Sequence, residues 1–348
     1  MSTVENVDAK AIFLKSYPKG EPQPAHFETR SIPRPTLNDG EVLLRTVWMS
    51  VDPYMRGRMR PDVKSYIPPF SLDEPLDGGA VSEVIDSKSE KFAAGDYVVG
   101  FAGGWKSLHK ASADAMTKVD PTVAPLSAYL GVLGMPGLTA WAGLTQICQP
   151  KEGETLFVSG AAGAVGSLVC QLGKKRGLRV VGSAGSAEKC AWLEAEGGCD
   201  VAINYKEHRG SAALTRALAA AAPKGVDCYF ENVGGDHLEA ALNCIGFGGR
   251  IALCGMISVY NATDPQPGPP NLTNMIGRGV LAKGFIVSNY MHLTPDFIAE
   301  VAPALAAGQI KFRESVYDGL ENAPDAFAGL FRGDNFGKAV VRIGPDRL

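Results

Sequence analysis

The sequence predicts an α/β protein that joins a doubly wound parallel sheet to a smaller β domain. Short apolar runs alternate with helical stretches from about Thr155 to Gly308, a pattern typical of a parallel sheet with both faces covered. The first hundred residues instead hold short alternating runs cut by Pro and Gly, which indicate an irregular β structure. A length of 348 residues suits two hydrophobic cores rather than one.

Each predicted strand depends on a run of its own. In the first region, residues 41–47 and 95–100 have the composition of strands. After Gly308 the β pattern returns in residues 339–343, so the last forty residues are predicted to rejoin the first domain. The parallel strands are predicted at residues 156–158, 180–181, 201–203, 226–230, 251–253 and 285–287.

Charge and hydropathy exclude several classes of partner. The net charge of -3 arises from Lys and Arg mixed among Asp and Glu, so we expect no basic face that would bind nucleic acid. Glycines and a proline break the apolar stretch from Leu130 to Leu144, and no run approaches the roughly 18 to 20 residues of a membrane helix. Met1 to Lys10 lack the basic start and apolar stretch of a secretory signal, which predicts a cytoplasmic protein.

The cysteines predict neither disulfides nor a zinc site. Their number is odd, no pair has CxxC spacing, and several lie in apolar runs where cysteine behaves as a small buried hydrophobe. The first 147 residues contain no cysteine and two histidines, His26 and His109, which are too few for a catalytic zinc. We therefore expect no metal. The cysteines are Cys148, Cys170, Cys190, Cys199, Cys228, Cys244 and Cys254.

A glycine-rich segment, residues 159–166 (SGAAGAVG), follows the first parallel strand and precedes a predicted helix. Gly160, Gly163 and Gly166 are spaced three residues apart. A helix that begins inside such a loop directs its first N–H groups at an anion, and glycine lets a pyrophosphate approach the backbone. Because glycine turns also serve ordinary packing of helix on strand, the position of the motif, more than the motif itself, predicts dinucleotide binding.

The segment after the second parallel strand favours NADPH over NADH. NAD sites usually carry an Asp or Glu about twenty residues after the loop, where it binds the ribose 2′-hydroxyl. This chain has Gly182 to Ser186 (GSAGS) there, and Lys189 lies one helical turn further on. A lysine at this place would bind a 2′-phosphate, although Glu188 argues in the other direction and Lys189 alone could be a solvated helix residue.

Five segments together resemble one family: residues 51–59 (VDPYMRGRM), 134–140 (GMPGLTA), 231–235 (ENVGG), 254–261 (CGMISVYN) and 333–338 (GDNFGK). From about residue 10 to 345 the chain resembles the zinc-independent medium-chain dehydrogenases/reductases. Within them it is similar to the branch of prostaglandin reductases, plant double-bond reductases and bacterial NADPH-dependent curcumin reductases. The first segment is far more specific than the glycine loop.

The resemblance implies a GroES-like catalytic β domain, residues 1–130 and 309–348, and a Rossmann NADPH-binding domain, residues 131–308. Dimers of this family join their Rossmann sheets edge to edge, which implies a homodimer in which the 285–287 strand finds a partner. The resemblance also implies which residues bind NADPH. Ala162, Gly163, Ala164, Val165 and Gly166 would lie at the pyrophosphate, Lys189 and Tyr205 at the 2′-phosphate, and Asn232, Cys254, Gly255, Met256, Ile257, Ser258, Tyr260, Phe285, Ile286, Val287 and Asn335 along the rest of the cofactor.

The activity implied by the resemblance is that of a 2-alkenal or enone reductase. Hydride goes to the β-carbon of an α,β-unsaturated ketone or aldehyde and a proton to the α-carbon, so hydrogen-bond donors are needed near the carbonyl oxygen. Tyr260 and Tyr54 are the candidate catalytic phenols, and either could instead only shape the pocket while solvent supplies the proton. A quinone reductase using the same cofactor and a non-catalytic NADPH-binding module are the alternatives.

Overall fold

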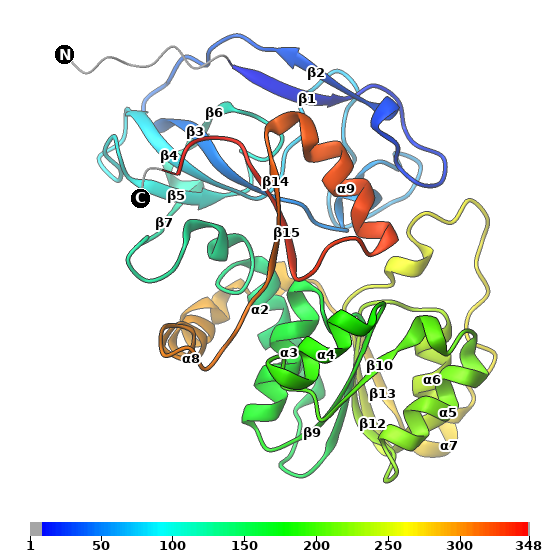
Figure 1. Ribbon diagram of the computed structural model, residues 1–348. Coiled ribbons are helices and arrows are strands. Elements are labelled where there is room, and N and C mark those ends of the chain that lie inside the picture. Colours follow the sequence, from blue (N-terminus) through cyan, green and yellow to red (C-terminus); the bar gives the residue numbers. More distant parts are fainter. Residues whose placement is uncertain (1–8, 347–348) are drawn as a thin grey trace. The chain divides into compact units, whose positions relative to one another are not determined.

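The computed structural model describes residues 9–346 (Figure 1). The chain divides into two compact units, of which the first runs to Gly131 and resumes at Glu314, while the second spans Val132–Arg313. Each unit has a large sheet of its own. Most of the N-terminal stretch behind the prediction of a cytoplasmic protein, residues 1–8, lies outside the described residues, as do residues 347–348 of the predicted β domain.

Six parallel strands form the sheet of the second unit, in the order β10-β9-β8-β11-β12-β13. The strand order reverses between β8 and β11, because the chain runs outward from β8 to β10 and then returns to β11. Loops diverge at such a point and leave room for a ligand at the carboxyl ends of the strands. The strands are β8 (Thr155–Val158), β9 (Arg179–Ala184), β10 (Val201–Asn204), β11 (Val226–Glu231), β12 (Ile245–Leu253) and β13 (Leu281–Gly284).

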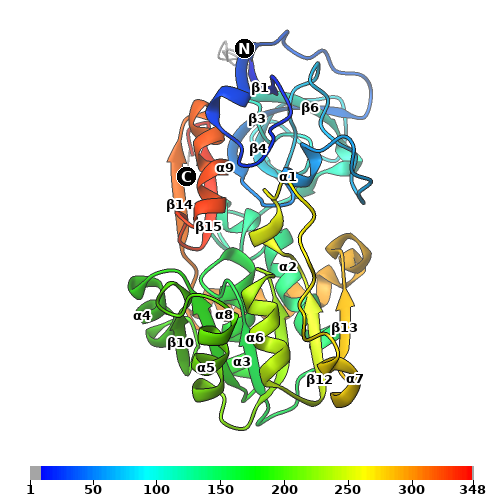
Figure 2. The same cartoon turned by 90° about the vertical axis from the view of Figure 1, so that its right-hand side faces the viewer.

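Helices cover both faces of this sheet. Leu156 points to α3 (Ala164–Lys175), and a Cβ at Gly173 of that helix would lie only 2.6 Å from it. Phe157 and Tyr229 face the other side, where they pack with leucines of α5 (Ser211–Ala221) and α6 (Asp236–Cys244), which lie side by side in Figure 2. Among the described residues, no helix is long and apolar enough to cross a membrane. The remaining helices and turns of this unit are α2 (Met135–Ala142), a π-helical turn (Gly143–Cys148), α4 (Ala187–Ala195), α7 (Asn274–Arg278), α8 (Thr294–Ala306), η5 (Tyr205–Glu207), η6 (Ile257–Val259) and η7 (Val287–Leu293).

The first unit contains a seven-stranded sheet and a separate pair of antiparallel strands. The larger sheet has the order β14-β15-β3-β4-β5-β7, with β6 pairing to the long strand β3. Among the strands described in this unit, only β14 and β15 pair in parallel. The elements are β1 (Lys10–Leu14), β2 (Phe27–Ser31), β3 (Glu41–Ser50), β4 (Ala80–Ser87), β5 (Tyr97–Gly100), β6 (Leu108–Ser112), β7 (Thr117–Lys118), β14 (Glu314–Asp318), β15 (Lys338–Arg342), α1 (Met55–Arg58), α9 (Ala323–Arg332), and the 3-10 turns η1 (Pro24–His26), η2 (Ala113–Ala115), η3 (Leu126–Leu130) and η8 (Leu320–Asn322).

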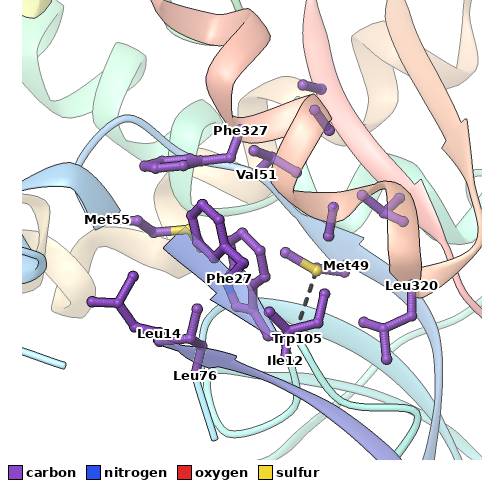
Figure 3. Packing of buried hydrophobic residues seen from close by; sticks show 14 of the residues in the cluster. Ile12, Leu14, Phe27, Met49, Val51, Met55, Leu76, Trp105, Leu320 and Phe327 are labelled. Atoms are coloured by element: carbon purple, nitrogen blue, oxygen red, sulfur yellow. Dashed lines mark hydrogen bonds between the residues drawn. The ribbon is translucent and has the colours of Figure 1, made fainter. Parts of the chain in front are cut away.

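An aromatic cluster forms one core of the first unit (Figure 3). The Trp105 ring stacks on Phe27 with centroids 5.7 Å apart and meets Phe327 of α9 edge-on at 6.0 Å. The backbone N–H of Trp105 donates to Met49 Sδ at 3.3 Å, the dashed line of Figure 3. Trp105 has a φ of 69°, which costs a non-glycine residue about 1 to 3 kcal/mol. Complete burial of its ring contributes a similar amount in the opposite direction.

The predicted α/β class is confirmed, and five of the six predicted parallel strands are found. The prediction of a strand at residues 285–287 is wrong, because β13 ends at Gly284. Phe285 packs edge-on against Phe230, with ring centroids 6.2 Å apart. The apolar residue that suggested a strand is therefore explained by this side-chain packing and not by pairing in the sheet. The strand itself is at the edge of the sheet and Leu281 is 56% exposed, so β13 lacks the continuous apolar run of a buried strand.

Candidate active site

The glycine loop joins β8 to α3 at the point where the strand order reverses. Gly160 has a φ of +59°, and its carbonyl accepts the Gly163 N–H at 3.0 Å, which closes a tight turn. Helix α3 begins at Ala164, and Ser167 N–H donates to Gly163 O at 3.0 Å. The N–H groups of residues 164–166 precede that first helical bond, so they are oriented to bind an anion.

The same loop fits a pyrophosphate because no large side chain stands in it. A Cβ at Gly166 would lie 2.4 Å from the Gly160 carbonyl oxygen and 2.8 Å from Ala161 Cα, so only glycine lets the helix approach the loop this closely. The flanking side chains of Ala161 and Ala162 are buried methyl groups. An anion here would meet backbone N–H groups at the positive end of a 12-residue helix.

The carboxyl ends of β9 and β10 form the edge where a 2′-phosphate is expected. Ser186 caps α4 by accepting the Lys189 N–H at 3.3 Å, so Lys189 lies in the first turn of that helix. A Cβ at Gly185 would lie 2.9 Å from the Tyr205 hydroxyl and 3.3 Å from Lys206 Cε. Burial raises the pKa of Tyr205, which keeps this phenol a neutral donor. The structure therefore brings Tyr205 together with Lys206, a residue that was not predicted.

A buried carboxyl holds the loop after β11. Glu231 ends this strand and is fully buried, and its Oε1 accepts the Ser159 hydroxyl at 2.8 Å, Val233 N–H at 2.7 Å and Gly234 N–H at 2.9 Å. Asn232 N–H donates to Ser159 Oγ at 2.9 Å, and Asn232 Nδ2 donates to Ser159 O at 2.7 Å. Burial raises the pKa of the Glu231 carboxyl. The loops after β8 and β11 are thus bonded into one piece.

The segment after β12 is braced by this same loop. Cys254 N–H and Gly255 N–H both donate to Glu231 O, at 3.0 and 3.1 Å. Further along, Ile257 N–H donates to Asn232 O at 3.2 Å. These predicted cofactor residues therefore adjoin the carboxyl ends of β11 and β12, beside the glycine loop of β8.

Tyr260 follows the short turn η6 in this segment. Its hydroxyl accepts the Met256 N–H at 3.3 Å. Burial raises the pKa of Tyr260, although the Met256 N–H opposes that shift. The phenol therefore keeps its proton, and because its oxygen already accepts a backbone N–H, its own O–H can donate to another group.

The segment that follows β13 lies at the same carboxyl end of the sheet and contains Phe285, Ile286 and Val287. Phe285 N–H donates to Leu253 O at 3.4 Å, which places the three residues beside the segment after β12. Phe285 also meets Tyr290 edge-on, with ring centroids 6.1 Å apart. Their position at the carboxyl edge of the sheet, and not in a strand, is what brings them toward the other predicted cofactor residues.

In the first unit, two of the segments that carry the family resemblance meet at a buried ion pair. Lys338 Nζ lies 3.2 Å from Asp52 Oδ1 and donates to Val51 O at 2.6 Å and Ala339 O at 2.9 Å. The hydroxyl of Ser50 bonds the other oxygen of Asp52. Both charged side chains are almost fully buried, at 4% and 7% exposure. A charge is tolerated in this core because its partners satisfy it.

Tyr54 lies two residues beyond Asp52, directly before α1, and packs against the cluster of Figure 3. Burial, together with the nearby Asp52 carboxylate, raises the pKa of Tyr54, so this phenol is also neutral. The Arg56 guanidinium donates to Gly20 O at 2.9 Å and so fixes the neighbouring backbone segment of the same unit. Asn335, the predicted cofactor residue of this unit, donates to Gly337 O at 2.8 Å and closes the turn before β15. Tyr54 and Tyr260 belong to different units.

Four residues with structural roles in these loops were not predicted from the sequence: Ser159, Lys206, Glu231 and Lys338. Glu231 and Lys338 stand inside segments that carried the family resemblance, and Lys206 follows Tyr205 directly. For these residues, the sequence offered one indication of a structural role, which is that each lies next to, or in the same segment as, a residue that was predicted. The contacts of Ser159 with Glu231 and of Lys338 with Asp52 join segments far apart in the chain, which no local pattern reveals.

No metal cluster is found in the part of the chain that the structure describes, since no three His, Cys, Asp or Glu side chains gather in a way that could hold an ion. The seven cysteines are free thiols, five of them buried and two half-buried. Cysteine therefore acts here mainly as a small packing residue, as predicted.

The fold and the site together define a dinucleotide-dependent oxidoreductase with a strand order of the 3-2-1-4-5-6 type. Two family models match the chain: "N-terminal domain of oxidoreductase" over residues 10–119, and "zinc-binding dehydrogenase" over residues 164–305. The chain belongs to the medium-chain dehydrogenase/reductase family, in the branch of curcumin, 2-alkenal and prostaglandin reductases.

Three relatives illustrate the likeness. An NADPH-dependent curcumin reductase of Escherichia coli is 44% identical, over 96% of this chain and 96% of that protein. A 2-alkenal reductase (NADP(+)-dependent) of Nicotiana tabacum is 43% identical, over 97% of this chain and 98% of that protein. The crystal structure of CurA in complex with NADPH from Vibrio vulnificus is 41% identical, with a TM-score of 0.89 over 97% of this chain and 99% of that one.

Proposed function

We propose that this protein is an NADPH-dependent reductase of the carbon-carbon double bond of α,β-unsaturated ketones and aldehydes. The observation that carries the proposal is the Tyr260 phenol, which is neutral, accepts a backbone N–H and keeps its own proton to donate. It stands among loops at the carboxyl edge of a dinucleotide-binding sheet. Relatives named for curcumin, 2-alkenal, prostaglandin and pulegone reduction support the same reaction.

NADPH is the cofactor, and we propose that residues of the second unit, together with Asn335 of the first, hold it. Ala162, Gly163, Ala164, Val165 and Gly166 would hold the pyrophosphate through backbone N–H groups, and Lys189 and Tyr205 would hold the 2′-phosphate. We propose that Asn232, Cys254, Gly255, Met256, Ile257, Ser258, Tyr260, Phe285, Ile286, Val287 and Asn335 line the rest. The absence of a carboxylate in residues 182–186 supports NADPH, because an acid there would repel a 2′-phosphate.

The protein's own part in the reaction is to stabilise charge and move a proton. NADPH, when bound, supplies a hydride to the substrate β-carbon. As the carbonyl oxygen becomes an enolate, a neutral phenol donates a hydrogen bond to it, which is the general means by which enzymes stabilise developing oxyanions. We propose Tyr260 as the principal donor and source of the proton for the α-carbon, with Tyr54 as the second phenol.

NADPH consumption against a small substrate panel tests this function. The panel contains a 2-alkenal, a linear enone, a diarylheptanoid enone and a quinone, each repeated with NADH. We expect saturated products that retain the carbonyl by mass spectrometry, formed preferentially with NADPH. Turnover of the quinone alone would instead assign a quinone reductase, and NADPH binding without turnover of any substrate would assign a non-catalytic module.

We propose that the two units are the functional domains, with residues 1–130 and 309–348 as the GroES-like catalytic domain and residues 131–308 as the NADPH-binding domain. The division of the described chain near Gly131 and Glu314 supports these limits. We also propose a cytoplasmic location. Seven free thiols, most of them buried, support a reducing compartment.

We propose a homodimer that forms through the β13 edge. The exposed apolar residues Phe247, Ile276 and Leu281, at 87%, 85% and 56% exposure, lie on β12, α7 and β13, next to that edge. An unpaired strand edge with apolar side chains around it favours pairing with a second copy. Ile276→Asp should convert the dimer to a monomer in light scattering, whereas a wild-type monomer would contradict the proposal.

A further inference from the structure

Buried polar side chains line up beneath the nucleotide loop. The register of β9, β8 and β11 places Ser183, Ser159 and Glu231 side by side at the carboxyl ends of three neighbouring strands. Ser183 Oγ, Glu231 Oε2 and the hydroxyl of Tyr229 are buried and none has a partner at hydrogen-bonding geometry in the described part of the chain, although the Tyr229 hydroxyl is close enough to interact with the Glu231 carboxyl. An unpartnered oxygen is far more costly on a buried carboxylate than on a neutral carboxylic acid.

The surroundings of Glu231 favour the neutral acid. Within residues 9–346 it makes no ion pair, and its titratable neighbours are Tyr229 on the same strand, Cys254 after β12, and Tyr260. None of these is a cation. The Tyr229 ring is fixed by stacking on Phe157 with centroids 5.0 Å apart, so its hydroxyl stays near the carboxyl.

Two consecutive loops connect the Glu231 carboxyl to Tyr260. Oε1 fixes the N–H groups of Val233 and Gly234, and Gly234 has a φ of +79°, which glycine adopts without strain. The Val233 carbonyl then accepts the N–H of Ser258 at 3.0 Å and its hydroxyl at 2.5 Å. Ser258 belongs to the turn that ends immediately before Tyr260.

We propose that the carboxyl of Glu231, in its neutral form, is a positioning residue that fixes the loop carrying Tyr260. It acts through the loops after β11 and β12, since it is itself fully buried beneath them. The proposal rests on the proposed function, because the position of Tyr260 affects turnover only if the chain reduces an enone.

Two variants of the full-length protein test the proposal. Glu231→Ala releases three donors, and we expect kcat to fall about tenfold to a hundredfold, as a misplacement of roughly 1 Å can do, while KM changes little. Glu231→Gln keeps an acceptor at one atom and a donor at the other, and should stay within about threefold of wild type. Normal kcat in Glu231→Ala, or a Glu231→Gln as impaired as Glu231→Ala, would overturn the proposal.

Asp227 provides the matched control on the same strand. Its Oδ2 accepts the Thr155 N–H at 2.8 Å at the opposite end of β11, away from the loops. Asp227→Ala should lower stability without changing kcat, which separates a general weakening of the sheet from a misplaced loop. An equal loss of kcat in Asp227→Ala would show that the effect is merely structural.

Infrared spectroscopy tests the protonation state independently of turnover and of the folding of Glu231→Ala. The difference spectrum of wild type against Glu231→Gln at neutral pH should contain the C=O stretch of a protonated carboxylic acid that shifts in D₂O. Carboxylate bands alone would overturn the neutral form. If wild type reduces no enone, the proposed function fails, while this spectrum still decides the state of Glu231.

Discussion

The two units hold their candidate catalytic tyrosines by opposite kinds of buried polar contact. Beside Tyr54, the first unit buries a full ion pair, Lys338 with Asp52, whose remaining atoms are met by carbonyls and a hydroxyl. Behind Tyr260, the second unit buries a single acid, Glu231, that meets N–H and O–H donors without a cation.

The difference shows that a buried polar contact can be built with or without a cation, and with Glu231 neutral, as proposed above, the two kinds respond differently to change. Removing one partner of an ion pair leaves an uncompensated charge in the core, whereas a neutral acid can be replaced by an amide of the same shape. A change to Lys338 or Asp52 should therefore sharply lower the stability of the first unit. A change to Glu231 should displace the loop that carries Tyr260, and so lower turnover, before it unfolds the second unit.

The largest expected effect concerns the two phenols themselves. If Tyr260 donates the proton, Tyr260→Phe should lower kcat by about 100-fold to 10,000-fold, the usual range for general acid catalysis. The cost of Tyr54→Phe should be smaller. Stopped-flow kinetics with saturating NADPH would measure both variants.

If Tyr54→Phe lost more activity than Tyr260→Phe, the proton donor would be Tyr54, which lies in the unit that contains the Lys338–Asp52 ion pair. The comparison between the two units would then fail. A loss of less than about fivefold in Tyr260→Phe would leave that residue as a wall of the pocket, far below the range for general acid catalysis. Unchanged NADPH binding in both variants is the control for intact loops.

The ion pair gives the next effect, on stability. Lys338→Met leaves Asp52 buried without its cation, and we expect the free energy of unfolding to fall by about 3 to 5 kcal/mol. Adding Asp52→Asn should recover much of the loss, since no buried charge then remains. Denaturant unfolding measures all three proteins.

An exposed ion pair supplies the control for this experiment. Lys91 and Asp114 form a pair at 59% and 80% exposure, so Lys91→Ala should cost at most about 1 kcal/mol. If Lys338→Met cost no more than Lys91→Ala, the contrast between a charged and an uncharged anchor would lose its basis.

The sequence predicted the sheet of the second unit better than its anchors, for a physical reason. Buried parallel strands are continuous apolar runs, so residues 156–158 and 251–253 were found, and the glycine loop was found from its position after a strand. The edge strand β13 is exposed and carries no such run, so the adjacent Phe285 was mistaken for it. Glu231 appeared only as one letter of a family segment, because its burial and its contact with Ser159 depend on a neighbouring strand far away in the sequence.

Acid sensitivity offers a third test, with one buried histidine in each unit. Burial lowers the pKa of His237 to about 4 and that of His109 to about 3. Because these folded pKa values lie below that of an unfolded histidine, only the unfolded chain binds a proton as the pH falls below about 6.5, and stability decreases until the folded pKa is reached. His237→Phe, which keeps an aromatic ring against Tyr205, should remove about 2 kcal/mol of the stability difference between pH 7 and pH 5.

Denaturant unfolding at the two pH values checks this, and His292, an exposed residue, supplies the control variant His292→Gln. An unchanged acid dependence in His237→Phe would mean that His237 is already charged in the folded protein. If His109→Phe alone removed the dependence, the first unit would be the acid-sensitive one.

The smallest expected effect concerns the cofactor contacts of the second unit, which are tested separately from the buried Glu231. Lys189→Ala should weaken NADPH binding by about 1.5 to 3 kcal/mol, the value of a hydrogen bond to a charged group, and should leave NADH binding nearly unchanged. Lys206→Ala tests whether the second lysine, whose Cε lies close to Gly185 and so to Tyr205, shares the 2′-phosphate. Lys224→Ala, an exposed lysine in the turn before β11, is the control for loss of net charge. Fluorescence titration with both cofactors measures each affinity.

Equal weakening of NADPH binding and NADH binding in Lys189→Ala would refute the role of Lys189 at the 2′-phosphate. NADH lacks that group, so its binding can be affected only through a distorted loop.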